Sequence, residues 1–206
     1  MIRAVTLILL SGLWLSGSAV ATAAEADEPS QIIQNAASEM LKELDAHRAE
    51  FQRDPSKVSA LVDRVLLPHF DTEYAAQQVL AKYWRTATPE QRQRFINAFY
   101  QSLLRNYGNA LLDFTADRMT ILPFKGDVAS GRAVIRTQIK RDNGTQVPVN
   151  YSVRKSERGW MAYDVSIEGI SYIKSYRTDF APEIDQKGLD AVIDRLEKQG
   201  AKRSGK

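Results

Sequence analysis

Residues 147–171 read VPVNYSVRKSERGWMAYDVSIEGIS, and this stretch predicts two β-strands joined by a tight turn. Apolar side chains alternate with polar ones in both strands, which is the period of two expected when one face is buried and the other is wet. The apolar rows are Val147, Val149, Tyr151 and Val153 in the first strand and Met161, Tyr163, Val165 and Ile167 in the second. Residues 156–159, SERG, supply the turn.

Two more strands are predicted just before this stretch. A short one covers residues 119–123, and a longer one has the apolar row Ala133, Ile135, Thr137 and Ile139. The tract Asp142-Asn143-Gly144 that follows has the composition of a tight hairpin turn. Together these strands predict a curved antiparallel meander.

The rest of the chain carries helical patterns. Apolar residues recur at three- and four-residue spacing in residues 30–51, 55–67, 72–80, 89–111, 171–186 and 189–197. Thr88-Pro89-Glu90-Gln91 has the pattern of a capping box with proline in the first turn, which marks a helix start. Pro182 is expected to bend or interrupt the helix that contains it. Helices first and strands second predict an α+β fold, with the helices packed on one face of the sheet.

The amino terminus predicts export. Arg3 precedes an apolar run over residues 4–15, and Ala21-Thr22-Ala23 fits small-residue cleavage, so residues 1–23 are predicted to be a secretory signal peptide. A membrane anchor is the alternative, but the run is shorter than the roughly 20 residues that span a bilayer, and no cysteine could carry a lipid. We expect one domain over residues 24–206, with a frayed basic tail at about 198–206.

Charge and composition exclude several classes of protein. Cleavage would remove Arg3 and leave 27 basic against 25 acidic side chains, a net charge of +2. Basic residues cluster only in the tail, so a nucleic-acid partner is not expected. The chain has no cysteine, so the fold must be held by its own apolar core rather than by disulfides.

Catalytic and metal-binding patterns are sparse. The chain has two histidines, and His69 with Asp71 offers two of the three or four donors that a metal needs. No nucleophile elbow, phosphate-binding glycine loop or dinucleotide fingerprint occurs. Asp164 and Glu168 alternate with the apolar row, which predicts solvated or salt-bridged surface carboxylates. We therefore expect no enzyme activity, no metal and no cofactor.

An apolar pocket is the remaining hypothesis. Stripes of this kind usually form core, but a concave meander beneath a wide apolar helix face can enclose more apolar surface than close packing needs. We predict a helical wall of Phe95, Phe99, Leu103 and Tyr107, with Leu80, Tyr83 and Trp84 nearby. We predict a sheet wall of Ile135, Ile139, Val147, Val149, Tyr151, Val153, Tyr163, Val165 and Ile167.

Several motifs in this order resemble one family. They are Tyr83-Trp84-Arg85 with Thr88-Pro89-Glu90-Gln91, then Val147-Pro148-Val149-Asn150-Tyr151, Ile167-Glu168-Gly169-Ile170-Ser171, and Tyr176-Arg177 with Phe180. The chain resembles the MlaC family, also called the toluene-tolerance family, over nearly all of the mature sequence. It departs where the family commonly has Leu-Gly before the tryptophan, and Asn150 replaces a common aspartate.

The resemblance implies a periplasmic carrier of Gram-negative bacteria that binds one or two phospholipids. It implies shuttling between an outer-membrane lipoprotein–porin complex and an inner-membrane ABC-type transporter, which maintains outer-membrane lipid asymmetry. It also implies a cone-shaped fold similar to the nuclear-transport-factor class. Two alternatives stay open on that fold. One is an enzyme that uses Tyr151 or Tyr163 with a buried carboxylate, and the other is a chaperone that binds apolar client segments.

Overall fold

A five-stranded antiparallel sheet forms one side of the molecule in the computed structural model, which describes residues 28–204 except 55, 114, 116–117 and 142. The strands are β1 (Met119–Ile121), β2 (Arg132–Lys140), β3 (Gln146–Ser156), β4 (Gly159–Ile167) and β5 (Ile170–Ser171), paired in chain order. The predicted meander is confirmed. The predicted signal peptide and its cleavage near Ala23 lie outside the described residues, as do residues 205–206.

The two long hairpins turn where the sequence predicts. Gly144 and Gly159 have φ angles of +81° and +90°, which suit glycine because it lacks a Cβ. Ser156 pairs with Gly159, so Glu157 and Arg158 form a two-residue loop between β3 and β4.

The pairing of β3 with β4 corrects one predicted row. Val153 pairs with Ala162, but its neighbour Ser152 pairs with Asp164, so Tyr163 is an extra residue in a β-bulge. An inserted residue moves the side chains that follow it to the opposite face. Val165 and Ile167 therefore share a face with their partners Tyr151 and Val149, whereas Met161 lies opposite Arg154 on the other face. The four residues predicted as one row are split between the two faces.

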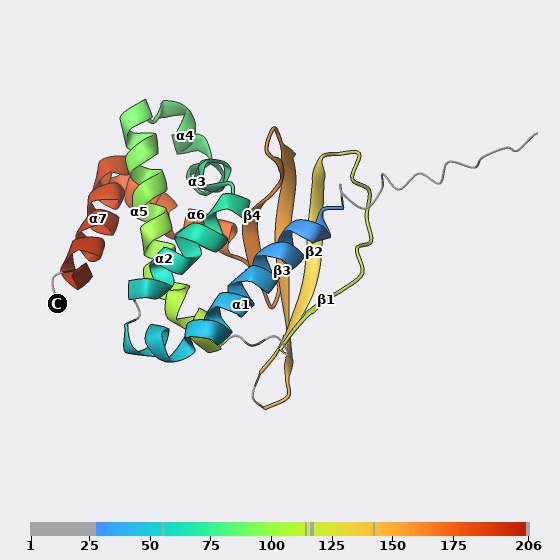
Figure 1. Ribbon diagram of the computed structural model, residues 1–206. Coiled ribbons are helices and arrows are strands. Elements are labelled where there is room, and N and C mark those ends of the chain that lie inside the picture. Colours follow the sequence, from blue (N-terminus) through green and yellow to red (C-terminus); the bar gives the residue numbers. More distant parts are fainter. Residues whose placement is uncertain (1–27, 55, 114, 116–117, 142, 205–206) are drawn as a thin grey trace, which may run out of the picture.

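The helices gather on one side of the sheet (Figure 1). They are α1 (Ser30–Arg53), α2 (Ser56–Val65), α3 (Thr72–Leu80), α4 (Lys82–Thr86), α5 (Pro89–Tyr107), α6 (Tyr172–Lys187) and α7 (Leu189–Ser204). Two short 3₁₀-helices join them, η1 (Leu67–His69) and η2 (Gly108–Asp113). Figure 1 shows α1 beside the sheet and α7 farthest from it. The predicted α+β class is confirmed.

The predicted helix starts are confirmed by their caps. The Asp71 carboxylate accepts a hydrogen bond from the backbone N–H of Tyr74 at 3.1 Å. Thr88 and Gln91 form the reciprocal capping box of α5, with distances of 3.0 and 3.1 Å. Each cap satisfies a backbone amide that the first helical turn leaves without a partner.

Two helix ends differ from prediction. α6 continues through Pro182 to Lys187, so the proline does not interrupt it. α7 continues past Glu197 to Ser204, so most of the tail that we expected to be frayed has helical backbone. Gly188, with a φ of +82°, ends α6 as predicted.

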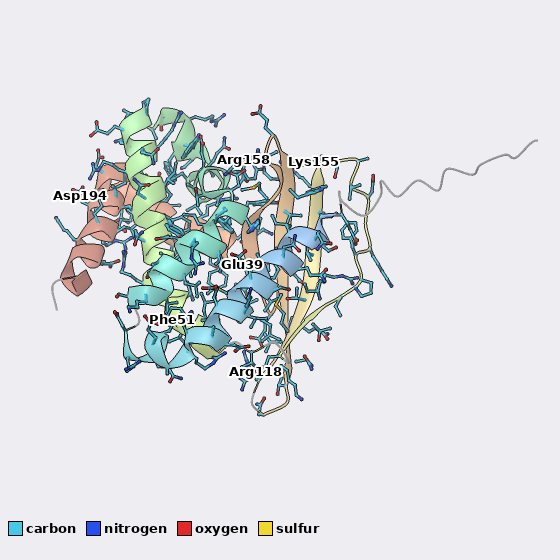
Figure 2. The ribbon with its side chains drawn as sticks, viewed as in Figure 1. Glu39, Phe51, Arg118, Lys155, Arg158 and Asp194 are labelled. Carbon is cyan, nitrogen blue, oxygen red and sulfur yellow. The ribbon has the colours of Figure 1, made fainter. Side chains whose placement is uncertain are left out.

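A core of aromatic and aliphatic side chains, here called the helical core, fills the space between α3, α5, α6 and α7. The rings of Phe95 and Phe99 stack with centroids 5.6 Å apart, and Phe180 meets both edge-on at 6.0 and 6.2 Å. A second cluster joins the end of α1 to α2 through Phe51, Val58 and Leu61, and Phe51 is labelled in Figure 2. The helical core is a different cluster from the one on the sheet face beside α1, and Phe70 packs against both.

Candidate functional site

A pocket of about 200 Å³ lies between α1 and the sheet and is here called the α1–sheet pocket. α1 forms one wall with Ile33, Ala36, Ala37, Met40, Leu41 and Leu44. The remaining lining comes from Leu66, His69 and Phe70 around η1, Leu111 of η2, and Met119, Tyr151, Ala162 and Val165 of the sheet. The lining is almost entirely apolar, as in sites that bind apolar ligands.

The sequence of α1 explains why this helix forms a wall. Its lining residues recur every three or four positions, so they share one face of the helix. The ends of this face are anchored, because Ile33 is 6% exposed and Leu44 is fully buried. Between these anchors, Ala36 and Ala37 extend only a methyl group toward the sheet, and small side chains here leave space that larger ones would fill.

Two of the fourteen lining residues have polar side chains, His69 and Tyr151. Tyr151 lies in the middle of β3, where it pairs with Ile135 of β2 and Val165 of β4. Burial raises the pKa of its phenol to about 12, because an apolar environment disfavours the phenolate. The hydroxyl is therefore neutral at physiological pH.

The structure brings part of the predicted sheet wall to this pocket. Tyr151 and Val165 line it directly. Ile135 and Val153 are buried in the cluster that also holds Ile33 of α1, and Val147 and Val149 are buried farther along the strand. Ile139 is partly buried in the same row of β2. The inner face of the sheet is thus the face that we predicted.

Ile167 and Tyr163 lie elsewhere. Ile167 lines a separate open pocket with Tyr107 and Ile170. Tyr163, moved by the bulge, packs edge-on against Tyr74 with centroids 5.0 Å apart and lines a surface groove with Arg132 and Arg136. Neither residue belongs to the lining of the α1–sheet pocket.

The predicted helical wall differs most from the structure. Phe95 and Phe99 are buried in the helical core, and Leu103 packs against it. Tyr107 is 41% exposed and meets Tyr172 at 4.9 Å. The cause is that α6 and α7 cover the apolar stripe of α5, which the stripe itself does not reveal.

Three further residues that we predicted near the helical wall also lie outside the lining of the α1–sheet pocket. Leu80 and Trp84 are buried in the helical core, and the Tyr83 hydroxyl donates to the carbonyl of Ala181 at 3.2 Å. The α1–sheet pocket therefore takes its helical wall from α1 rather than from α5. Lipid contact by these three residues and by the α5 stripe stays a prediction.

Sequence reasoning identified α1 as an amphipathic helix but did not place it at the pocket. The stripe of α1 has the small pair Ala36-Ala37 in its middle. This pair is not a sufficient signal, because the equally small pair Ala75-Ala76 of α3 is buried in the filled helical core.

Asp164 corrects another expectation, because it is 8% exposed rather than solvated. Its carboxylate accepts hydrogen bonds from the Ser171 hydroxyl at 2.5 Å and from the Ile173 backbone N–H at 3.1 Å, at the start of α6. Glu168 is exposed, as predicted, and lies 3.7 Å from Arg141. Asp164 thus holds a helix start and is not among the residues that line the α1–sheet pocket.

The described part of the chain offers no cluster of three or more histidine, cysteine or carboxylate side chains that could hold a metal. Asp71 is engaged by Tyr74 and by Arg154, whose guanidinium lies 3.4 Å away. Within residues 28–204, no helix has an apolar stretch of the length needed to cross a bilayer.

Comparisons with known proteins agree with this architecture. The toluene tolerance protein ttg2D of Pseudomonas putida is 33% identical over 172 residues, which cover 82% of this chain and 80% of that protein. The intermembrane phospholipid transport system binding protein MlaC of Haemophilus influenzae is 24% identical over 183 residues, which cover 87% of this chain and 86% of that protein.

A solved structure is similar as well. It is the phospholipid-binding protein from Ralstonia solanacearum in complex with a phospholipid, with a TM-score of 0.78 and 27% identity, covering 85% of this chain and 98% of that chain. The family model described as MlaC protein matches residues 34–198. The resemblance seen in the sequence is therefore confirmed, and the chain belongs to the MlaC family.

Proposed function

We propose that this protein carries phospholipid and shelters the acyl chains in the α1–sheet pocket. The single observation that carries the proposal is the lining of that pocket, in which twelve of fourteen side chains are apolar. One compared protein is named the binding protein of an intermembrane phospholipid transport system, and another is a phospholipid-binding protein that was solved with a phospholipid bound. An apolar cavity in a chain of this family fits the same ligand.

The energetics favour acyl chains as cargo. Removing one methylene group from water is worth about 0.8 kcal/mol, so two long chains represent on the order of tens of kcal/mol. Much of that energy is absent from the net affinity, because a lipid in a membrane has already hidden its tails there. The carrier therefore works near exchange balance with the bilayer, and the direction of transport must come from its partners.

The size of the pocket adds a requirement. Pockets for drug-sized ligands have volumes of roughly 300–1,000 Å³, whereas the α1–sheet pocket measures about 200 Å³. The walls must therefore separate as two acyl chains enter. α1 is suited to this, because His47 interrupts its helical backbone with φ −129° and ψ 17° between the pocket segment and Phe51, which is buried in the second cluster.

The head group is expected to stay outside. No lysine or arginine lines the pocket to neutralise a phosphate, and moving an unpaired charge into an apolar site costs several kcal/mol. Weak discrimination between head groups follows, because they remain in water while the tails provide the affinity.

The compartment and the partners complete the proposal. The predicted signal peptide supports a periplasmic location for the mature chain, where a carrier would pass lipid between an outer-membrane lipoprotein–porin complex and an inner-membrane ABC-type transporter. Such exchange would support the lipid asymmetry of the outer membrane. The protein itself needs no cofactor for this exchange.

Native mass spectrometry of the purified protein tests the carrier function. The wild-type protein should carry co-purified phospholipid, and Val165→Asp should lose it, because a carboxylate in the lining opposes acyl chains. Val134→Asp is the matched control, since Val134 is 51% exposed on the outer row of β2 and should leave the lipid in place. Lipid retained by Val165→Asp, or none in the wild type, would contradict the proposal.

A further inference from the structure

Tyr151 is the one side chain with a hydroxyl in the lining of the α1–sheet pocket, and it is partly buried. Within the described residues its hydroxyl makes no hydrogen bond, and the only fully buried side-chain atom without a partner there is Thr115 Oγ1. Acyl chains that fill the pocket would displace the water that reaches the Tyr151 hydroxyl, and a polar group that loses water without gaining a partner costs free energy. A lipid-filled pocket therefore needs an acceptor for this hydroxyl.

Packing alone does not provide one. The ring of Tyr151 packs with the cluster of Ile33, Ile135 and Val153, and a phenylalanine ring would make the same apolar contacts. Water is a poor substitute, because an ordered internal water needs two to four polar partners. Besides Tyr151, the lining offers only the His69 side chain.

The chemistry of a phospholipid indicates which of its parts can accept a hydrogen bond from the Tyr151 hydroxyl. A diacyl phospholipid has three parts, which are the tails without acceptors, the neutral ester carbonyls where the tails begin, and the charged phosphate. A phosphate would require a cation, and the lining has no lysine or arginine. The ester carbonyl is uncharged, accepts a hydrogen bond and adjoins the tails, so it is the one part of the lipid that matches a neutral phenol in an apolar wall.

We propose that the Tyr151 hydroxyl donates a hydrogen bond to an ester carbonyl of the bound lipid and so makes the carrier prefer ester-linked over ether-linked lipids. The inference rests on the proposed carrier function. Tyr151 is suited to the role because it lies in the middle of β3, hydrogen-bonded to strands on both sides, which fixes the origin of its side chain.

A competition experiment measures this preference directly. The protein is equilibrated with vesicles containing equal amounts of a diester phosphatidylcholine and its diether analogue with the same chain length, and native mass spectrometry gives the ratio of the two bound lipids. The ratio does not depend on how much of a variant is folded. The wild type should favour the diester by about 2- to 12-fold, the range that corresponds to one net hydrogen bond.

Three variants separate the outcomes. Tyr151→Phe should bind both lipids in a ratio near one, while the matched control Tyr163→Phe, on the other face of the sheet, should keep the wild-type ratio. A wild-type ratio near one, or an unchanged ratio in Tyr151→Phe, would overturn the inference. Loss of the preference in His69→Ala with its retention in Tyr151→Phe would assign the donor to His69 instead. Absence of either lipid from the wild-type protein would contradict the carrier function itself.

Discussion

The helical core and the α1–sheet pocket are built from the same kinds of side chain, yet one is filled and the other is hollow. Phe95, Phe99 and Phe180 pack against one another in the helical core, and Phe95 has no exposed surface. On α1, the corresponding stretch of the stripe is Ala36 and Ala37, and a pocket remains. The helical core also contains the alanine pair Ala75-Ala76, which is fully buried. Small side chains therefore leave a cavity only where the opposite wall does not fill the space beside them.

The largest effect on stability is expected in the helical core. Phe95→Ala should lower the free energy of unfolding by about 3–5 kcal/mol, because the ring is fully buried and its neighbours cannot collapse into the space. Urea unfolding followed by tryptophan fluorescence measures this. The molecules that remain folded should still carry lipid, and their losing it would show that the helical core and the pocket are not independent.

The link between the two regions gives the next effect. Asp164 lies on β4, a strand of the pocket, and caps α6, a helix of the helical core. Asp164→Ala should lower the free energy of unfolding by about 1–3 kcal/mol, since the buried N–H of Ile173 loses its acceptor. Ser171→Ala keeps that acceptor but removes the N-cap oxygen that accepts from the Lys174 N–H at 3.1 Å, so it should cost about 0.5–2 kcal/mol. A cost for Asp164→Ala below that for Ser171→Ala would contradict the role assigned to Asp164.

Filling the pocket should have a small effect on stability and a large one on cargo. Ala37→Phe places a ring where space exists, so the free energy of unfolding should change by less than about 1.5 kcal/mol. Bound phospholipid should fall by at least about tenfold, measured by native mass spectrometry. Ala46→Phe places the same ring on an exposed position of α1 and should leave occupancy unchanged. Full occupancy in Ala37→Phe would place the tails elsewhere.

Acid should weaken the helical core through one ion pair. Hydrogen bonds from Arg195 hold the pKa of Glu183 below its ordinary value of 4.5, with the nearest N–O distance 2.6 Å. A carboxyl whose pKa is lowered by folding stabilises the protein above pH 4.5, and that contribution is lost as the pH falls through the lowered pKa. Glu183→Gln should therefore reduce the loss of stability between pH 4.5 and more acidic conditions, measured as melting temperature against pH.

The sequence was sufficient for the architecture because local signals decide it. The caps at Asp71 and Thr88, the turn glycines Gly144 and Gly159, and the alternation in β2 and β3 each depend on only a few neighbouring residues. These signals predicted the α+β fold and the inner face of the sheet. Tyr151 and Val165, which line the pocket, were found in this way.

The helical wall could not be predicted because it depends on contacts between distant segments. The stripe of α5 is covered by α6 and α7, which lie far along the chain, as in the contact of Phe95 with Phe180, whose ring centroids are 6.0 Å apart. The bulge at Tyr163 likewise appears only in the register with Ser152 and Val153, since β4 alone shows an unbroken alternation. Both features depend on contacts between segments that are distant in the sequence, and the residue pattern of a single segment does not show those contacts.

Photo-crosslinking tests the central claim most directly, that acyl chains lie between α1 and the sheet. A phospholipid with a diazirine in the middle of one acyl chain is loaded into the protein, and the complex is irradiated. The labelled residues are then identified by peptide mass spectrometry. We predict labels on Met40, Leu41 and Leu44 of α1 and on Val165 of β4. Labels confined to the α5 stripe at Phe95 and Phe99, or to the outer face of the sheet, would contradict the account.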